Sequence, residues 1–246
     1  MNRTLTLLFF FFLAGIGFTK AQNWGGGVDE DKFNWGYSFQ YVSAEYKLWK
    51  YPSWRLPIPN EDFTGYISDS LSSISSKPTA GFAIGFVANR KINDNLDLRS
   101  TPSLVFSERN LIYTYYPILE PTVTVKKVQA TMIELPLSLK LKSDRLNNFR
   151  AYILGGLKYS IDIVSKKKND NANVLDELSK NINNQKSFIS YEAGAGMDFY
   201  FGFFKMSTEL KVSQSFNDIL LHESTIYASP IEKAKLRHFT FSLFFE

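Results

Sequence analysis

Three side chains near the end of the sequence are of the types that hydrolytic chemistry uses. His238, Ser242 and Glu246 follow one another at four-residue intervals. In an extended strand this spacing puts a base, a nucleophile and an acid on one face. Each interval covers about 13 Å, at about 3.3 Å per residue, which is too far for a direct Ser–His contact. A reaction centre would therefore need a partner from a neighbouring strand. The candidates for this partner are Glu192, Ser190 and Ser207.

No hydrolase motif surrounds these residues, so His238 is also interpreted as an ordinary inward-facing residue of a β-barrel, and His222 is expected in a loop. The chain has two histidines and no cysteine. Disulfides, thiolate metal sites and a lipid-anchored cysteine are thereby excluded, and a histidine-rich metal centre is disfavoured. The stretch "WGGGV" (24–28) lacks the strand–turn–helix context of a phosphate loop. We expect no cofactor and no small-molecule substrate.

The N-terminus has the features of an export signal. Arg3 precedes the apolar run "LTLLFFFFLAGIGF" (5–18), and Ala21 offers a small residue at the cleavage site. We expect a signal peptide over 1–21 and a periplasmic leader over 22–32; a membrane-anchoring helix is the alternative. Cleavage would lower the formal charge from +4 to +2, because it removes two cations and no acid. The charge therefore does not predict a nucleic-acid partner.

Alternation of apolar and polar residues is the strongest pattern in the remaining chain, 33–246. This period of two predicts β-strands with one apolar and one polar face. No later run reaches the roughly 18 apolar residues of a membrane helix. Eight segments alternate: 33–47, 79–89, 95–107, 126–141, 149–164, 187–200, 204–215 and 235–246.

The connections between these segments alternate in length. "RKINDN", "KSDRLNN" and "FGF" are short turns, whereas the other connections are long. Short turns on one rim and long loops on the other are typical of outer-membrane barrels. We therefore predict an all-β fold, an eight-stranded antiparallel transmembrane barrel with short periplasmic turns and long extracellular loops. A water-soluble β-sandwich would alternate too, but the Gly- and Ser-rich polar face suits a narrow interior better.

Aromatic residues crowd the stretch 199–204, between two alternating segments. Bulky rings favour the boundary between membrane and water, so we expect a hairpin turn at that depth. The stretch "NVLDELSKNI" (173–182) has apolar residues at helical spacing and predicts a short helix in a loop, or a contact with a partner.

Parity places cations and acids on the inner faces of the strands. An eight-stranded barrel is barely wide enough for its own side chains, so balanced charges are expected to pair and fill it. A conducting pore or a substrate pocket is the alternative. The expected charge network consists of Arg99, Glu134, Lys140, Arg150, Lys158, Asp162, Glu192, Asp198, Glu209 and Lys211, with Asp97 and Lys205 on the same faces.

Three stretches resemble the PorT (also SprT) family of the Bacteroidota type IX secretion and gliding-motility machinery. They are "GFAIGFVANRKINDNLDLRSTPSLVFSERNLIY" (81–113), "IELPLSLKLKSDRLNNFRAYILGGLKYSIDI" (133–163) and "FYFGFFKMSTELKVSQSFNDIL" (199–220), followed by the terminal "FSLFFE". The resemblance implies a non-enzymatic outer-membrane component of protein secretion. Its expected partners are outer-membrane lipids and other type IX components. The polar positions that match the family pattern are Arg145, Asn148, Arg150, Glu209 and Asn217.

We interpret these five positions as turn and barrel-interior architecture first, and as functional contacts second. Three other functions remain open at this point. The chain could be a generic OmpA-like barrel with a structural or adhesive role, a lipid-modifying outer-membrane enzyme, or a small channel.

Overall fold

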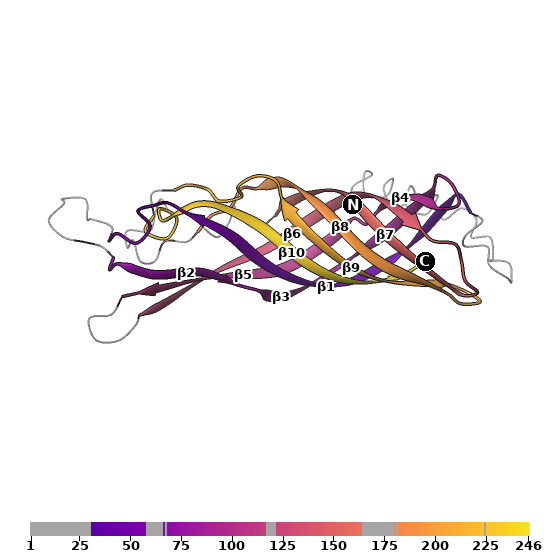
Figure 1. The fold of residues 1–246 in the computed structure, drawn as a ribbon, viewed down its shortest axis with the longest axis horizontal. Helices are drawn as coiled ribbons and strands as arrows, with labels where there is room; N and C mark the ends of the chain where they lie inside the picture. Colours follow the sequence, from indigo (N-terminus) through magenta and orange to yellow (C-terminus); the bar gives the residue numbers. More distant parts are fainter. Residues whose placement is uncertain are drawn as a thin grey trace, which may run out of the picture.

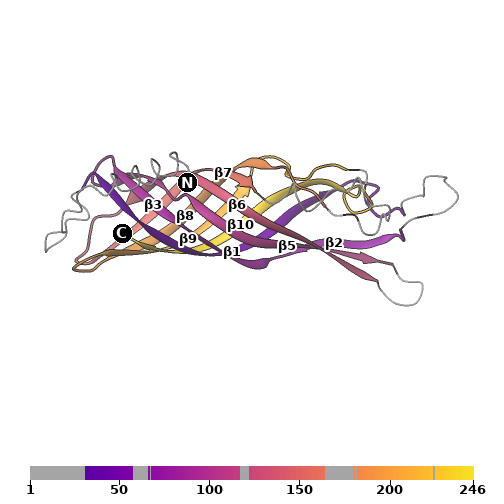
Figure 2. The ribbon, with the colours of Figure 1, turned by 180° about the vertical axis from the view of Figure 1, so that it is seen from behind.

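Ten strands form one antiparallel sheet that closes on itself (Figures 1 and 2). The computed structural model describes residues 31–57, 66, 68–116, 122–163, 180, 182–223 and 225–246. In that part of the chain no helix has the length and apolar character that crossing a membrane requires. The strands are β1 (Phe33–Lys50), β2 (Leu71–Lys77), β3 (Thr79–Lys91), β4 (Leu96–Ser100), β5 (Ser103–Tyr115), β6 (Val123–Lys142), β7 (Phe149–Asp162), β8 (Ser187–Tyr200), β9 (Lys205–Ser215) and β10 (Ile231–Phe245).

The ten strands occupy eight positions around the ring, because two barrel strands are interrupted by proline. Pro78 separates β2 from β3, and Pro102 separates β4 from β5. Proline has no N–H to give to a ladder, so each interruption falls where one hydrogen bond is missing. Strand β3 pairs with both β4 and β5 in one continuous register. Along β5, the register changes by one residue where its partner changes from β3 to β2. The predicted eight-stranded barrel is confirmed.

The strands are strongly staggered, and the stagger keeps the barrel narrow. A row of cross-strand partners that starts at Leu141 on β6 runs through β7, β8, β9, β10, β1, β3 and β5. It returns to β6 at Thr131, ten residues from its start. In an eight-stranded barrel such a shear tilts the strands steeply and leaves room only for side chains inside.

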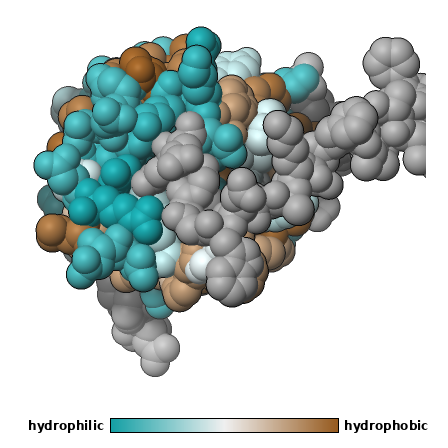
Figure 3. Space-filling model, turned by 90° about the vertical axis from the view of Figure 1, so that its right-hand side faces the viewer, coloured by the Kyte–Doolittle hydropathy of each residue, from teal (hydrophilic) through white to brown (hydrophobic). Residues whose placement is uncertain are grey.

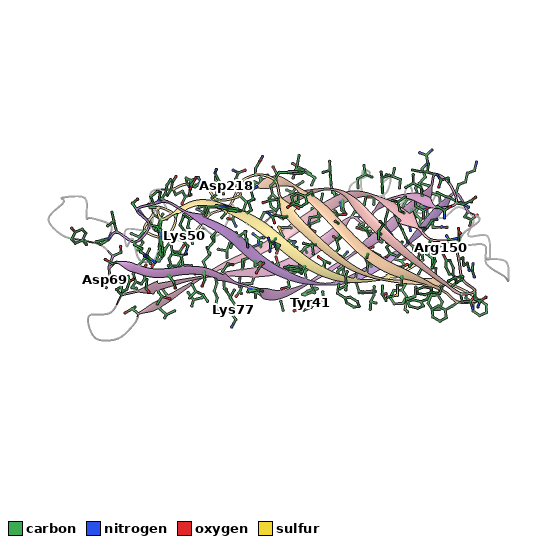
Figure 4. The ribbon with its side chains drawn as sticks, viewed as in Figure 1. Tyr41, Lys50, Asp69, Lys77, Arg150 and Asp218 are labelled. Carbon is green, nitrogen blue, oxygen red and sulfur yellow. The ribbon has the colours of Figure 1, made fainter. Side chains whose placement is uncertain are left out.

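The outer wall carries an apolar band on the part of the barrel nearer the short turns. Tyr41, labelled in Figure 4, is its last residue on β1 toward the extracellular end, and Trp35 is 69% exposed. Further along the same outer faces, polar residues replace the band, for example Glu45 and Lys47 on β1. The strands therefore continue past the membrane as an extracellular extension of the barrel. The band includes Trp35, Tyr37, Phe39, Tyr41, Phe82, Ile84, Phe86, Leu135, Leu137, Leu139, Ile153, Leu157, Ile189, Tyr191, Leu210 and Phe241.

The predicted strand segments agree with the observed strands except at the extracellular end. The segment 187–200 coincides with β8, whereas 95–107 is divided into β4 and β5 and extended to Tyr115. Strand β2 was missed, since its sequence LSSISSK does not alternate and lies in the region expected to be a loop. The signal peptide, most of the leader and all of 173–182 except Lys180 and Ile182 lie outside the described residues.

The aromatic stretch 199–204 forms the predicted hairpin turn between β8 and β9. The backbone N–H of Phe201 donates to the carbonyl of Phe204 at 2.9 Å, and the two rings stack at 4.8 Å. Phe203 is exposed, whereas Tyr200 points into the barrel. Figure 3 looks onto this end and shows hydrophilic side chains over much of the visible face, with hydrophobic ones toward its edge.

Candidate functional site: the charged barrel lumen

Inward-facing side chains of every strand meet in the barrel interior, here called the lumen. Of the ten charged residues expected there, nine are buried in the lumen, from all the ring positions between β4 and β9. Arg150 is the exception, because it is half-buried at the turn rim, where its guanidinium lies 6.0 Å from the ring of Tyr200. The expected neighbours Asp97 and Lys205 are buried as well.

A first cluster lies near the turn end of the lumen and is centred on Arg99. The Nη1 of Arg99 lies 2.8 Å from Oε2 of Glu209, and its Nη2 lies 3.1 Å from Oε1 of Glu246. The Tyr152 hydroxyl donates to Glu209 at 3.0 Å, and Lys205 pairs with Glu246. The final side chain of the sequence is thus an ion-pair partner inside the barrel.

A second cluster joins Lys140 to Asp198. The ammonium of Lys140 lies 2.9 and 2.8 Å from the two carboxylate oxygens of Asp198, and Ser207 donates to the same carboxylate at 2.6 Å. The ammonium also lies 3.8 Å from the Tyr152 ring centroid. Tyr152 fits there because Gly196 is opposite: a Cβ at position 196 would overlap the phenol ring.

A third cluster lies at mid-lumen around Glu134. Lys158 donates to both Glu134 oxygens at 2.9 Å and to Ser213 at 2.9 Å. His238 Nδ1 lies 3.3 Å from Glu134. Next to this cluster, Lys211 lies 3.3 Å from Glu192.

The structure corrects the expected surroundings of His238. Its carboxylate neighbour is Glu134 on β6, and Glu192, Ser190 and Ser207 do not contact it. Within the described ranges its Nε2 has no hydrogen-bond partner, and neither does the hydroxyl of Ser242. A Ser–His pair that could activate a nucleophile is therefore not assembled among the described residues.

Several lumen residues lie outside the sets expected from the sequence. Lys142 pairs with Asp97 at 2.7 Å, one residue beyond the expected end of its strand. Arg109 on β5 is buried, and its Nη2 contacts the sulfur of Met132 at 3.0 Å. The alternation Ser103, Val105, Ser107 continues to Arg109, so a longer strand assignment would have found it.

Aromatic and aliphatic side chains fill the lumen of the extracellular extension. Tyr227, from the connection between β9 and β10, is buried there; its carbonyl accepts a 2.7 Å hydrogen bond from the Tyr113 hydroxyl. The two rings meet edge to face at 5.3 Å, and the ammonium of Lys126 lies 4.1 Å from the Tyr227 ring. Burial raises the pKa of Tyr113 well above its usual value and that of Tyr115 to about 12.

The family-pattern residues are divided between the β6–β7 turn, the lumen and an exposed connection. Arg145 donates to the Asn147 carbonyl at 2.6 Å and to Asn148 Oδ1 at 3.3 Å, and its guanidinium lies 4.0 Å from the Tyr200 ring. Asn147 has a φ of 54°, a left-handed conformation that asparagine tolerates. Glu209 is in the lumen, and Asn217 is exposed after β9.

Taken together, the lumen is a sequence of ion-paired clusters that ends in an apolar plug. Each buried charge in these clusters has a partner from another strand, which is how a narrow barrel can tolerate charge in its interior. The arrangement connects opposite walls of the barrel.

A closed antiparallel barrel with an apolar outer band and a charged lumen defines an integral outer-membrane β-barrel protein. The family model described as "Outer membrane protein beta-barrel domain" matches residues 10–221, and the chain belongs to this family. The protein is accordingly located in the outer membrane.

Two solved structures from Pseudomonas aeruginosa are similar to the chain. The outer membrane protein OprG is 13% identical with a TM-score of 0.45, and the match covers 87% of this chain and 93% of OprG. The N-terminal barrel domain of OprF is 8% identical with a TM-score of 0.29, covering 84% and 96% of the two chains. No curated protein sequence matches significantly.

Proposed function

We propose that this barrel is a non-enzymatic component of the type IX protein secretion system that supports cargo export and gliding motility. The proposal rests on the PorT/SprT-like stretches 81–113, 133–163 and 199–220, which together cover just under half of the described residues. Residues such as Arg145 and Asn148 belong to the more specific of these stretches and lie exposed or half-buried at the turn rim, where another protein can reach them.

The observation that carries the proposed role is the filled lumen. Arg99 bridges opposite walls through Glu209, Lys140 and Lys158 pair with acids of nearby strands, all within 3.1 Å, and Tyr227 plugs the extracellular end. A polypeptide has no path through such an interior. The role in secretion is therefore docking, with the extracellular extension or the turn rim in contact with larger components.

The absence of catalysis is part of the same proposal. His238 is buried, and its Nδ1 is engaged by Glu134 and Lys158. A lipid substrate would have to enter a lumen that is closed at this level. Replacement of His238 with Ala should leave the lipid profile of the envelope unchanged. An altered profile would instead support the alternative that the protein is a lipid-modifying enzyme.

The decisive experiment is deletion of the gene followed by analysis of secreted cargo and of gliding. Loss of type IX cargo from the medium, restored by the wild-type chain, is the expected result. The variant Arg145→Ala/Asn148→Ala should then lower secretion if the turn rim is the docking surface, and Lys186→Ala should lower it if the extracellular end is. Normal secretion after deletion would refute the proposal, and altered envelope integrity without a secretion defect would support a generic OmpA-like barrel.

A further inference from the structure

A group of cations lies on the outer wall of the extracellular extension, just beyond the apolar band. Its members are on β10, β1, β2 and β6, and β5 lies between the last two of these strands. The acids on this outer wall are fewer: Glu45, which lies 3.7 Å from Arg237, Glu232, which lies 3.8 Å from Lys233, and Glu108. The outward-facing cations are Lys47, Lys77, Lys127, Lys233, Lys235 and Arg237.

Three of the outward-facing residues form one row across β2, β5 and β6, which we name the lysine row. Asn110 is paired with Lys77 on one side and with Lys127 on the other. Both lysines are exposed, and Figure 4 shows Lys77 on the outer side of the wall. Among the described residues neither lysine has an ion-pair partner, and Asn110 Oδ1 is shielded from water without a hydrogen bond.

The geometry of the lysine row suits an anion held above Asn110. Direct cross-strand neighbours have Cβ atoms about 5 Å apart, so the two lysines begin about 10 Å from each other. A lysine stem of four carbons lets both ammonium groups converge over the central asparagine. The amide of Asn110 supplies one further donor and one acceptor between them.

A second observation on the same side of the barrel points to the same kind of ligand. Lys47 on β1 and Lys235 on β10 are direct cross-strand partners on the outer face. Like charges in this position are destabilising unless an anion lies between them. Lys47 has no ion-pair partner among the described residues, and the only contact of Lys235 there is the Trp49 ring at 5.8 Å.

The height of the lysine row places it in the head-group layer. Phe106, which stacks on Phe82 at 4.9 Å, ends the apolar band on β5. Asn110 follows four residues later, about 13 Å further along a tilted strand. Lipid phosphates lie immediately outside the acyl chains, so they are the anions available at this depth.

We propose that this face binds the phosphorylated glycolipid of the outer leaflet, with one phosphate in the lysine row. The phosphate accepts hydrogen bonds from Lys77, Lys127 and the Asn110 amide nitrogen. On binding, the side chain of Asn110 rotates outward, and its Oδ1, which is otherwise shielded without a hydrogen bond, accepts one from a sugar hydroxyl. A phospholipid whose head group carries no hydroxyl does not supply this bond. The Lys47–Lys235 pair holds a second phosphate or a neighbouring molecule.

One acid opposes this site and makes the proposal sharper. Glu108 lies on the same outer face of β5, one step closer to the membrane, opposite Gln129. Its carboxylate repels a phosphate that binds closer to the apolar band than Asn110. Removing this charge with Glu108→Gln should therefore strengthen binding, which is the opposite of the effect of removing a lysine.

The test uses the full chain in nanodiscs and measures binding of lipid A, of dephosphorylated lipid A and of phosphatidylmethanol, an anionic phospholipid whose head group has no hydroxyl. Wild type should bind lipid A most tightly. The variant Lys77→Gln/Lys127→Gln should lose roughly tenfold or more in affinity for lipid A. Its affinity for dephosphorylated lipid A should stay the same, and Glu108→Gln should bind lipid A more tightly than wild type.

The matched control is Lys32→Gln/Arg90→Gln, which removes two exposed cations from the turn end of the same barrel. It should bind lipid A like wild type. The proposal is overturned if this control loses as much affinity as the lysine-row variant, or if dephosphorylated lipid A binds as tightly as lipid A. Equal binding of phosphatidylmethanol would overturn the glycolipid assignment. The heat-modifiable electrophoretic shift confirms that each variant is folded.

Discussion

The guanidinium of Arg99 on β4 and the carboxylate of Glu209 on β9 lie 2.8 Å apart, although 110 positions separate them in the sequence. Their strands occupy opposite positions in the eight-membered ring. The ion pair therefore bridges the full width of the lumen. Burial of an ion pair gives little net stability in itself, but loss of one partner leaves a buried charge uncompensated.

Replacement of Arg99 with Met is expected to destabilise the barrel by about 3–5 kcal/mol, since Glu209 loses its closest cation and Glu246 keeps only Lys205. The free energy of unfolding in urea, measured on protein refolded in detergent micelles, checks this value. The double variant Arg99→Met/Glu209→Gln should lose less than the sum of its single variants. Lys91→Met, which breaks the exposed pair with Asp94, should cost less than about 1 kcal/mol. Equal losses for Lys91→Met and Arg99→Met would contradict the bridging role.

Gly196→Ala should prevent or severely slow folding of the barrel. The new methyl group would occupy the space of the Tyr152 ring, which Arg99 and Glu209 hold in place. Gly155→Ala is the matched control, because its methyl group would meet only the Glu192 carbonyl at 3.8 Å. The fraction of protein that shows the heat-modifiable shift after refolding measures the effect. Comparable folding of both variants would show that a glycine at position 196 is not required to accommodate the aromatic ring of Tyr152.

Lipids brominated on their acyl chains should quench the fluorescence of Trp35 but not that of Trp54. Trp35 projects from the apolar band, whereas Trp54 lies beyond β1 at the extracellular end, with Lys50 4.2 Å from its ring. Single-tryptophan variants in vesicles separate the two signals. Strong quenching of Trp54 together with weak quenching of Trp35 would reverse the membrane position proposed for the barrel.

The extracellular plug should weaken at alkaline pH. Burial raises the pKa of Tyr115 to about 12 in the folded protein and also raises the pKa of Tyr113 well above its usual value. An unfolded tyrosine loses its proton near pH 10, so between about pH 10 and 12 the unfolded state binds fewer protons and stability falls as pH rises. Limited proteolysis of the β9–β10 connection across this range should show increasing cleavage. In Tyr113→Phe/Tyr115→Phe the additional pH dependence should disappear; its persistence would assign it to other groups.

Alternation made most of this architecture predictable. Leu135, Leu137 and Leu139 opposite Glu134, Ser138 and Lys140 already assign one face to lipid and the other to the lumen, because a strand turns successive side chains to opposite sides. Strand β2 escaped this reasoning, because Leu71 and Ile74 are separated by an irregular register rather than by strict alternation. Arg109 was missed for a different reason, because β5 alternates strictly but the predicted segment ended at residue 107.

The sequence by itself determined that eight strands alternate and that balanced charges face inward, with Arg150, Arg109 and Lys142 as the exceptions at strand ends. Only the tertiary structure decided the partners of those charges, because a pair such as Arg99 and Glu209 depends on the shear accumulated over four neighbouring strands. Local pattern sets the orientation of a side chain. Closure of the ring sets its height, and the height selects its partner.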